Sequence, residues 1–455
     1  MINTTKKVAL LVATLGGFLT PFSSHSINIA LPSIGKEFSM NAISLSWLVT
    51  AYLLASAIFL VPLGKIADIY GRKRIFIYGI LSFTITSFFL AISNSVTMLI
   101  CFRILQGIGG AVLFGTGVAI LTSVFPIEER GKVLGINVAA VYIGASLGPF
   151  LGGFLTEQFG WRSIFFVNVF LGLGILLLIF WKLKGEWAEA KGEKFDFVGS
   201  IIYSFTLITV IYGLSLLPKM LGAFLILLGV LGILTFVKWE IRTESPVLDI
   251  NLFKNNRVFA FSNLASFINY SAAFAVAFLL SLYLQYIKEF TPQDAGLILI
   301  FQPIIQALFS PFAGRLSDRI EPRIVASMGM GMTTIGLFLL SFLDVKTPIG
   351  FIVANLIIIG FGFALFASPN TNAAISSVEK RFYGVASGIL ATMRLTGQMF
   401  NMGITMLIFA IYIGKVQITP QYHPLFLRSI KIAFTFFAVL GLGGVLASFA
   451  RGKVR

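Results

Sequence analysis

The sequence predicts an all-α polytopic membrane protein with about fourteen transmembrane helices, and three observations support this fold class. First, 57% of the 455 residues are apolar, only 11% are charged, and the mean hydropathy is +0.93. Second, the apolar residues form long stretches, and a helix needs about 20 such residues to cross the roughly 30 Å hydrocarbon layer. Third, no polar segment between these stretches is long enough to form a soluble domain. Lipid must therefore cover much of the apolar surface.

The first six predicted spans follow one another closely from the N-terminus. Lys6 and Lys7 precede the first apolar run, as in a signal peptide. That run is longer than the apolar region of a signal peptide and lacks a small-residue cleavage site, so we expect it to remain as a span. The six predicted ranges are 8–31, 47–67, 75–91, 98–124, 133–155 and 164–183.

The other eight predicted spans form a central pair and a second group of six. A tight turn at Leu217-Pro218-Lys219 joins the members of the pair, since proline ends a helix. The pair covers 197–217 and 221–237, and the second group covers 258–286, 295–316, 324–343, 351–367, 385–413 and 430–450.

The basic residues alternate with the spans. A formal net charge of +16 indicates a nucleic-acid partner only where the basic residues gather on one soluble face or tail. Here most Lys and Arg residues fall in alternate loops on the side of the N-terminus, as the positive-inside rule describes for cytoplasmic loops. We therefore expect a multi-pass protein of the cytoplasmic membrane, with both termini in the cytoplasm and no nucleic-acid partner.

Two sequence patterns recur about 250 residues apart, as in transporters built from two similar halves. Residues 64–74 (GKIADIYGRKR) are echoed by 314–323 (GRLSDRIEPR), and 129–135 (ERGKVLG) by 380–388 (KRFYGVASG). We expect an N-terminal six-helix half at 1–183, linkers with an inserted helix pair at 184–257, and a C-terminal six-helix half at 258–455.

These motifs resemble those of the major facilitator superfamily, and within it the fourteen-span drug:proton antiporter branch. The resemblance covers essentially the whole chain. Residues 64–74 are similar to the family's signature loop between spans two and three, and Arg103 with Gln106 and the following glycines resembles its fourth-span motif. The run 144–153 (GASLGPFLGG) resembles the fifth-span motif of exporters. The resemblance implies two six-helix bundles that transport by alternating access, without a cofactor.

The resemblance also implies a latch that holds the two halves together on the cytoplasmic side. Glycine allows close backbone approach, and Asp68 can accept hydrogen bonds or face the N-terminus of a neighbouring helix. The alternative is that the cations of this loop only anchor it in the cytoplasm. The predicted latch residues are Gly64, Asp68, Gly71, Arg72, Lys73, Arg74, Gly314, Asp318, Arg319 and Arg323.

Two basic residues fall inside predicted spans, Arg103 in the fourth and Arg394 in the thirteenth. A cation at the centre of a bilayer costs about 3 kcal/mol on insertion scales, so each should face a partner or a polar cavity. Gln106 lies on the same helix face as Arg103. The resemblance implies a role for Arg103 in ion coupling or substrate binding, and the alternative is an arginine satisfied by Gln106 and backbone carbonyls. Arg394 fits helix packing and pathway lining equally well.

The first span carries more polar residues than lipid exposure would tolerate: Ser23, Ser24, His25, Ser26 and Asn28. We therefore expect this helix to line the transport pathway. Histidine changes its charge near neutral pH, so His25 is a candidate proton carrier. The alternative is a histidine that forms a hydrogen bond between helices.

The charges inside the spans depart from the pattern of the drug exporter branch. Where that branch usually has an aspartate in span one, this chain has Ser23, and all 18 Asp and Glu residues fall in loops or at span ends. Proton antiporters commonly use an intramembrane acid as the proton carrier. The remaining charges are positive, which favours neutral, lipophilic or anionic substrates. Further hydrogen-bonding side chains are Asn263, Asn269, Gln302, Gln306, Asn355, Asn370, Asn372, Gln398 and Asn401.

The fifth predicted span has small residues at the spacing that lets helices pack closely, and Pro149 predicts a kink. Two interpretations fit this run: helix packing alone, and the export function that the resemblance implies. The residues are Gly144, Gly148, Pro149, Gly152 and Gly153.

Composition and motifs also exclude several function classes. The two histidines and the single cysteine are scattered, so we expect no enzyme, no metal site and no cofactor. The sequence has no phosphate-binding lysine loop, so ATP is not the direct driver. A channel more often shows a repeated filter segment. We predict a monomeric secondary active transporter that exports a small amphipathic or drug-like compound, coupled to proton influx. The alternatives are transport of a non-drug metabolite or anion without proton antiport, and a membrane sensor that does not transport.

Overall fold

The computed structural model describes residues 2–243, 246–254, 256–379 and 382–452, without the side chains at 2–4, 127, 128, 131, 251, 318 and 384. Within this part of the chain, fourteen helices are long and apolar enough to cross a membrane. The prediction of an all-α membrane protein with two six-helix bundles and an inserted helix pair is confirmed. Residues 380 and 381 of the second sequence echo lie outside the described residues.

Six helices form the N-terminal half: α1 (Ile2–Glu37), α2 (Ala42–Tyr70), α3 (Arg72–Ala91), α4 (Val96–Val124), α5 (Ile127–Phe159) and α6 (Arg162–Lys182). Two of them, α2 and α4, begin before the predicted apolar stretches with a capped first turn. The Asn41 side chain accepts a hydrogen bond from the Ser44 amide at 2.9 Å, and Ser95 does the same for Met98 at 3.2 Å. These bonds satisfy amides that a helix leaves unpaired at its first turn. Helix α1 packs along α5, and α4 packs between α2 and α3.

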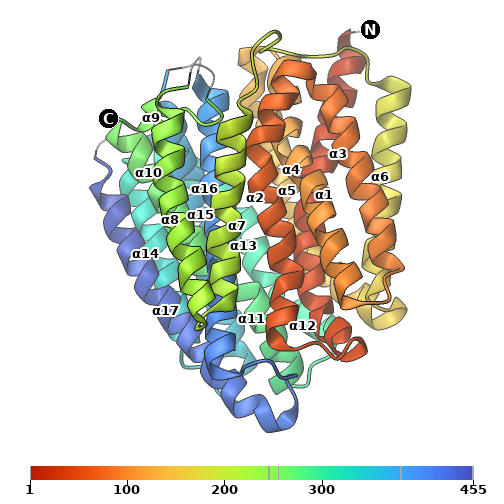
Figure 1. Ribbon diagram of the computed structural model, residues 1–455, viewed down its shortest axis with the longest axis vertical. Coiled ribbons are helices and arrows are strands. Elements are labelled where there is room, and N and C mark those ends of the chain that lie inside the picture. Colours follow the sequence, from red (N-terminus) through yellow and green to blue (C-terminus); the bar gives the residue numbers. More distant parts are fainter. Residues whose placement is uncertain (1, 244–245, 255, 380–381, 453–455) are drawn as a thin grey trace.

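The inserted pair consists of α7 (Phe197–Leu216) and α8 (Met220–Glu240), which lie antiparallel. Asp196 caps α7 by accepting a hydrogen bond from the Gly199 amide at 2.8 Å. Helix α7 contacts both α2 and α16 (Tyr383–Tyr412), and the Tyr203 hydroxyl donates to the Ala57 carbonyl at 3.0 Å. Helix α8 exposes most of its large apolar side chains, as a lipid-facing helix does. The pair therefore lies against the seam between the halves, in front of it in Figure 1.

Two spans of the C-terminal half are interrupted. The ninth span comprises α10 (Arg257–Ala273), α11 (Val276–Leu282) and a π-helical turn, η1 (Tyr283–Ile287), and the tenth comprises α12 (Pro292–Leu299) and α13 (Phe301–Arg319). The side chain of Asn401 holds the first break together, since it donates to the Ser271 carbonyl at 2.7 Å and accepts from the Ala275 amide at 2.9 Å. The half also contains α9 (Asn251–Lys254), α14 (Pro322–Leu340), α15 (Ile349–Ser376), α16, the 3₁₀ turn η3 (Pro420–Tyr422) and α17 (His423–Ala450).

Both termini lie at the same end of the bundle, at the top of Figure 1. Because consecutive spans alternate in direction, the turn after Asp68 and the turn after α13 also lie at this end, which we call the termini end. Direct contacts between the halves gather at the opposite end, which we call the far end. There the Ser281 hydroxyl donates to the Asn28 carbonyl at 2.6 Å, and the Gln285 amide donates to the Ile29 carbonyl at 3.0 Å.

The glycine run of α5 faces two partners. A β-carbon at Gly148 would lie 2.7 Å from the His25 β-carbon, and one at Gly152 would lie 2.8 Å from the Ser26 α-carbon, so these glycines and Gly144 admit α1 to close contact. Gly153 faces the other half, where a β-carbon would collide with the Pro292 carbonyl oxygen of α12. Pro149 of α5 is in close contact with Gly296 of α12. One glycine run thus packs its own half and closes the far end.

We predict that Gly153→Ala opens the far end. The added methyl group overlaps the Pro292 carbonyl, and such overpacking costs about 1–3 kcal/mol. A cysteine placed at Ser24, in a chain whose native Cys101 is replaced by alanine, should react at least about fivefold faster with a membrane-impermeant thiol reagent on intact cells.

Gly135→Ala is the matched control, because it lies on the same helix and a β-carbon there meets nothing within 4 Å. The control should leave the labelling rate unchanged. Equal rates in both variants would contradict the closing role of Gly153.

Candidate functional site

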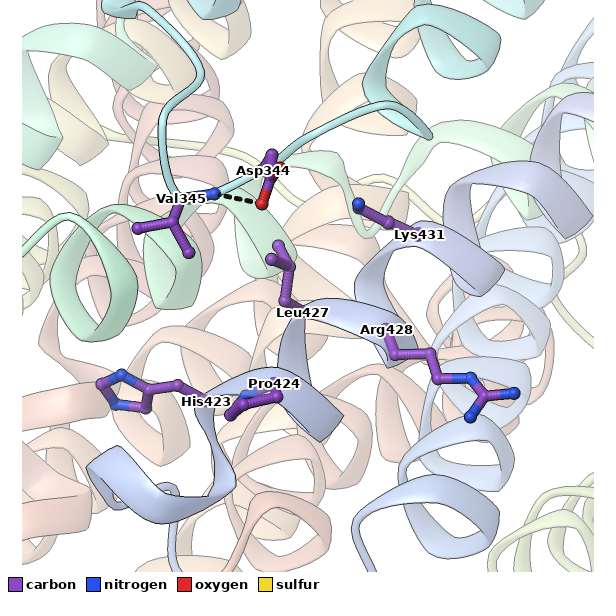
Figure 2. Close-up of a pocket in the computed structure, with 7 residues that line it drawn as sticks. All are labelled: Asp344, Val345, His423, Pro424, Leu427, Arg428 and Lys431. Carbon is purple, nitrogen blue, oxygen red and sulfur yellow. Dashed lines mark hydrogen bonds between the residues drawn. The ribbon is translucent and has the colours of Figure 1, made fainter.

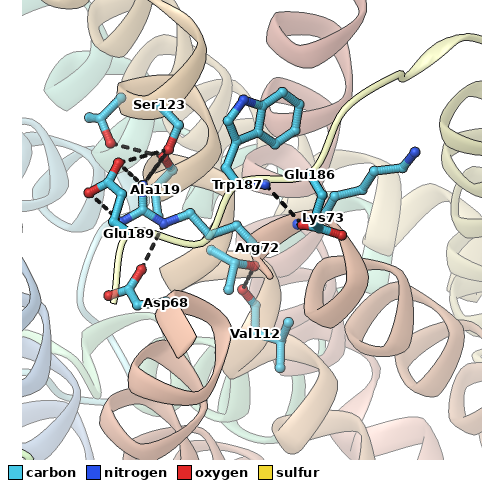
Figure 3. Close-up of polar contacts among 11 residues, drawn as sticks. Asp68, Arg72, Lys73, Val112, Ala119, Ser123, Glu186, Trp187 and Glu189 are labelled. Carbon is cyan, nitrogen blue, oxygen red and sulfur yellow. Dashed lines mark hydrogen bonds and ion pairs between the residues drawn. The ribbon is translucent and has the colours of Figure 1, made fainter. Parts of the chain in front are cut away.

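A polar cluster at the termini end surrounds Arg72, whose side chain is only 8% exposed. Its Nε donates to Asp68 at 2.7 Å, its two terminal nitrogens donate to the Glu189 carboxylate at 2.7 and 3.1 Å, and one of them also donates to the Ala119 carbonyl at 3.1 Å. The Ser123 hydroxyl completes the set (Figure 3). Two carboxylates and a carbonyl therefore satisfy one guanidinium, with the bidentate geometry that arginine favours.

Glu189 belongs to the linker, by which we mean residues 183–196 between α6 and α7. The linker binds the α2–α3 turn along its length. The Arg72 amide donates to the Trp187 carbonyl at 2.8 Å, and the Ala190 amide donates to the Asp68 carbonyl at 3.0 Å. Close to the turn, Glu193 pairs with Lys65 at 2.5 Å.

Glu186 provides the second anchor of the linker. Its carboxylate accepts hydrogen bonds from the amides of Lys73 at 2.8 Å and Arg74 at 3.1 Å, so a negative charge lies at the N-terminus of α3 (Figure 3). Gly71 adopts φ +117° directly before this helix, and a β-carbon there would lie 2.6 Å from the Glu186 carboxyl carbon. A residue other than glycine would be strained and would displace the linker.

The sequence predicted the Asp68 and Arg72 loop but missed the partners Glu186 and Glu189. Both lie in a polar segment of mixed charge, and nothing in their spacing distinguishes them from solvent-exposed residues. Gly64, the remaining residue of this predicted set, is the least constrained, because a β-carbon there would meet nothing within 4 Å.

The echo of this loop in the C-terminal half has different surroundings. Arg319 is exposed, Arg323 is partly buried, and a β-carbon at Gly314 would lie 3.0 Å from the Ser368 hydroxyl. The side chain of Asp318 lies outside the described residues.

Arg451, directly after α17, is the buried cation on this side of the C-terminal half. It is fully buried and donates to the Ser448 carbonyl at 3.0 Å, to the Asn370 side chain at 3.0 Å and to the Ser448 hydroxyl. Burial lowers the pKa of this guanidinium to about 10, so it stays charged at neutral pH. The sequence analysis missed it because Arg451 lies just beyond the last apolar stretch.

Arg103 lies deep inside the N-terminal half and is 1% exposed. Its Nε donates to the Leu48 carbonyl at 2.9 Å, one terminal nitrogen donates to Gln106 at 2.6 Å, and its guanidinium stacks 4.4 Å from the Tyr52 ring centroid. Gln106 in turn donates to Ser87 at 2.8 Å. This network joins α2, α3 and α4, and it supplies the contacts expected of an arginine satisfied within its own half.

The polar residues of the first span face different surroundings. Ser23 is buried and accepts a hydrogen bond from Asn168 of α6 at 3.1 Å, and Ser26 is buried and donates to the Gly148 carbonyl at 3.0 Å. Asn28 is buried at the contact between the halves. His25 is partly exposed, beside Gly148 of α5. Of these four residues, His25 is therefore the one that is not buried.

Arg394 lies in the middle of α16 and is partly exposed. One terminal nitrogen donates to the Thr371 hydroxyl, and its guanidinium lies 5.9 Å from the Tyr270 ring centroid. Its Nε has no partner among the described groups. Unlike Arg103, this arginine is partly exposed, and of the described contacts only the one to Thr371 uses its hydrogen-bond donors.

Two open cavities lie beside α17, away from the residues discussed above. One, of about 410 Å³, is at the far end, and its lining includes Asp344 of the α14–α15 turn and Lys431 of α17, whose side chain points toward Asp344 (Figure 2). The other, of about 420 Å³, is an apolar groove between α10 and α17. In the described residues, no group of three His, Cys, Asp or Glu side chains could hold a metal ion.

We predict that Glu189→Gln loosens the linker. The change removes one charge partner of the buried Arg72, and the loss is about 1 kcal/mol because Glu189 is 62% exposed and Asp68 remains. Trypsin should then cleave the purified protein at Lys184, Lys191 or Lys194 about fivefold faster. Glu193→Gln removes the pair with Lys65, a cation less buried than Arg72, and should change the rate less than twofold. Equal rates for the two variants would refute the anchoring role of Glu189.

Comparison with known proteins agrees with this architecture. The sequence model of the Major Facilitator Superfamily matches residues 13–246 and 262–454. The riboflavin transporter RibZ of Clostridioides difficile is 32% identical over 392 residues, which cover 86% of this chain and 85% of that protein. The multidrug resistance protein Stp of Mycobacterium tuberculosis is 29% identical over 409 residues, which cover 89% and 76%.

Solved structures share the fold at low sequence identity. A D-xylose–proton symporter superposes with a TM-score of 0.70 at 16% identity, covering 97% of this chain and 96% of that one. A bacterial homologue of the lysosomal transporter Spinster, in an inward-facing conformation, gives 0.69 at 16% identity, covering 98% and 97%. Since the family's sequence model covers nearly the whole chain and its helical architecture is present, this protein belongs to the major facilitator superfamily of membrane transporters.

Proposed function

We propose that this protein exports small amphipathic compounds across the cytoplasmic membrane by alternating access. The observation that carries the proposal is the unequal contact between the halves: they touch at the far end through α1, α5, α11 and α12, while the linker is bound to the N-terminal half at the termini end. Such an arrangement leaves the pathway closed at one end, as one state of a rocking transporter requires.

The orientation follows from the distribution of charge. The termini end carries most of the Lys and Arg residues, so we assign it to the cytoplasm and the far end to the outside. The state described above is then inward-facing. An exporter would load its substrate in this state, from the cytoplasm or the inner leaflet.

Two of the relatives support small organic compounds as substrates, one through multidrug resistance and one through riboflavin. The second candidate function is therefore transport of a planar metabolite such as a flavin. The observation that favours it is the position of Arg394, a cation among aromatic side chains, which suits a compound that accepts hydrogen bonds better than it suits a cationic drug.

Flux into inverted vesicles tests the proposal. Vesicles with imposed pH and voltage gradients, applied separately, would be given matched cationic, neutral and anionic compounds and riboflavin. Export predicts accumulation that a proton gradient, acidic inside, accelerates. Accumulation of riboflavin alone would favour the second candidate, and no flux for any compound would contradict both.

The latch hypothesis predicts a defect in Asp68→Asn. In the state described here Asp68 pairs with Arg72 at 2.7 Å, and in the opposite state we propose that its charge faces a helix N-terminus of the C-terminal half. Loss of the charge should slow transport in reconstituted vesicles about tenfold or more, with expression near normal. Turnover at the wild-type rate would remove the latch hypothesis.

His25 is the proposed proton carrier, since it is a partly exposed titratable group within the apolar part of the first span. His25→Gln keeps a hydrogen-bonding side chain but cannot change charge. We expect the variant to lose the pH dependence that the transport rate of the wild-type protein shows. An unchanged pH profile would eliminate His25 as the coupling site.

A further inference from the structure

Arg394 is a cation in the middle of the bundle whose hydrogen-bonding capacity is largely unused. A guanidinium has five N–H donors, and of the described contacts only the one to Thr371 of α15 uses them. Its Nε is enclosed by protein without a partner. Among the described residues, no carboxylate lies within ion-pair distance of it.

One aromatic ring contacts this cation, and that ring has aromatic neighbours from both halves. The Arg394 guanidinium lies 5.9 Å from the Tyr270 ring centroid, and Tyr270 meets Phe363 of α15 edge to face at 5.6 Å. Tyr142 of α5, in the N-terminal half, lies near enough to interact electrostatically with Tyr270. All three polar residues of this group, Arg394, Tyr270 and Tyr142, are partly exposed.

The other intramembrane arginine shows what a purely structural arrangement looks like here. Arg103 is 1% exposed, stacks tightly on Tyr52, and is tied to a backbone carbonyl and to Gln106. One of its terminal nitrogens also lacks a partner, but it is sealed inside one half, out of reach of a solute. Arg394 differs in its partial exposure and in its position between α15 and α10, where it contacts Thr371 and Tyr270.

We infer that Arg394, Tyr270 and Tyr142 form a substrate subsite for planar aromatic compounds that carry a carboxylate or another oxyanion. The guanidinium binds the oxyanion through its unused donors, and the two phenol rings contact the ring system. This inference rests on the proposed function, because it names the substrate class of the same pathway. Since the subsite draws on both halves, their rocking motion separates Tyr142 from the other two residues and releases the substrate.

Binding of three matched probes to the purified protein tests this inference. The probes share one ring system and differ in charge: 2-naphthoate, 2-naphthamide and 2-naphthylmethylammonium. We expect the wild-type protein to bind 2-naphthoate most tightly. Arg394→Gln should weaken binding of 2-naphthoate about 10- to 100-fold and change that of 2-naphthamide less than threefold. Arg394→Lys, which keeps the charge but loses the planar fork, should fall between.

Arg428→Gln is the matched control, because Arg428 also lies over a tyrosine ring, 5.5 Å from Tyr412, but at the far end outside the pathway. It should leave binding of all three probes unchanged. The inference would be overturned if Arg394→Gln and Arg428→Gln lost the same affinity for 2-naphthoate. It would also be overturned if the wild-type protein bound the three probes equally, or did not bind 2-naphthoate. If flux into vesicles shows no charge preference, the subsite inference is overturned and the export proposal stands. If the protein binds anions selectively but transports no compound, only the export proposal is overturned.

Discussion

The close approach of α5 to helices on both sides is the constraint on which the rest of this structure depends. On one side, α5 lies against α1, where Gly144, Gly148 and Gly152 leave room for backbone contact. On the other side, Gly153 and Pro149 lie against α12 of the opposite half. Membrane helices cannot rely on the hydrophobic effect to associate, because lipid is as apolar as they are, so shape and small residues decide the packing. The glycine run thus fixes both the bundle and the closed far end.

The buried arginines show how one residue type serves different roles. Arg72 joins a turn to the linker through two carboxylates, Arg451 holds segments of the C-terminal half together through neutral acceptors, and Arg103 joins three helices of the N-terminal half. Each has acceptors that offset the cost of removing a cation from water. Arg394 is partly exposed and keeps most of its donors free, and this combination separates a candidate binding residue from the structural arginines.

The linker adds a feature that two rigid bundles alone would not have. Because Glu186 and Glu189 bind the α2–α3 turn, the linker is part of the N-terminal half in this state, and it leads directly into α7 at the seam between the halves. A change in how the turn binds the linker can therefore reach α7, α2 and α16 together.

Much of the fold could be predicted from the sequence, and less of the site. Fourteen apolar stretches and alternating charge determine spans and their order, because the bilayer sets helix length and every backbone amide must be paired. The break at Ala275 could not be predicted, since it depends on Asn401, which is 126 residues away in the sequence. Glu186 and Glu189 were missed for the same reason: their partners are distant in the chain, and polar residues beside a membrane are common.

The central claim is that the halves rock, so that one end opens as the other closes. Spin labels at Lys132 and Arg319 report the termini end, and labels at Phe159 and Asp294 report the far end, since all four residues are exposed. Cys101 is replaced in the reconstituted protein, and the distances are measured by pulsed electron paramagnetic resonance. When an inward proton gradient is imposed, the distance between Lys132 and Arg319 should shorten and that between Phe159 and Asp294 should lengthen. Distances that both stay fixed, or that change in the same direction, would contradict alternating access in this protein.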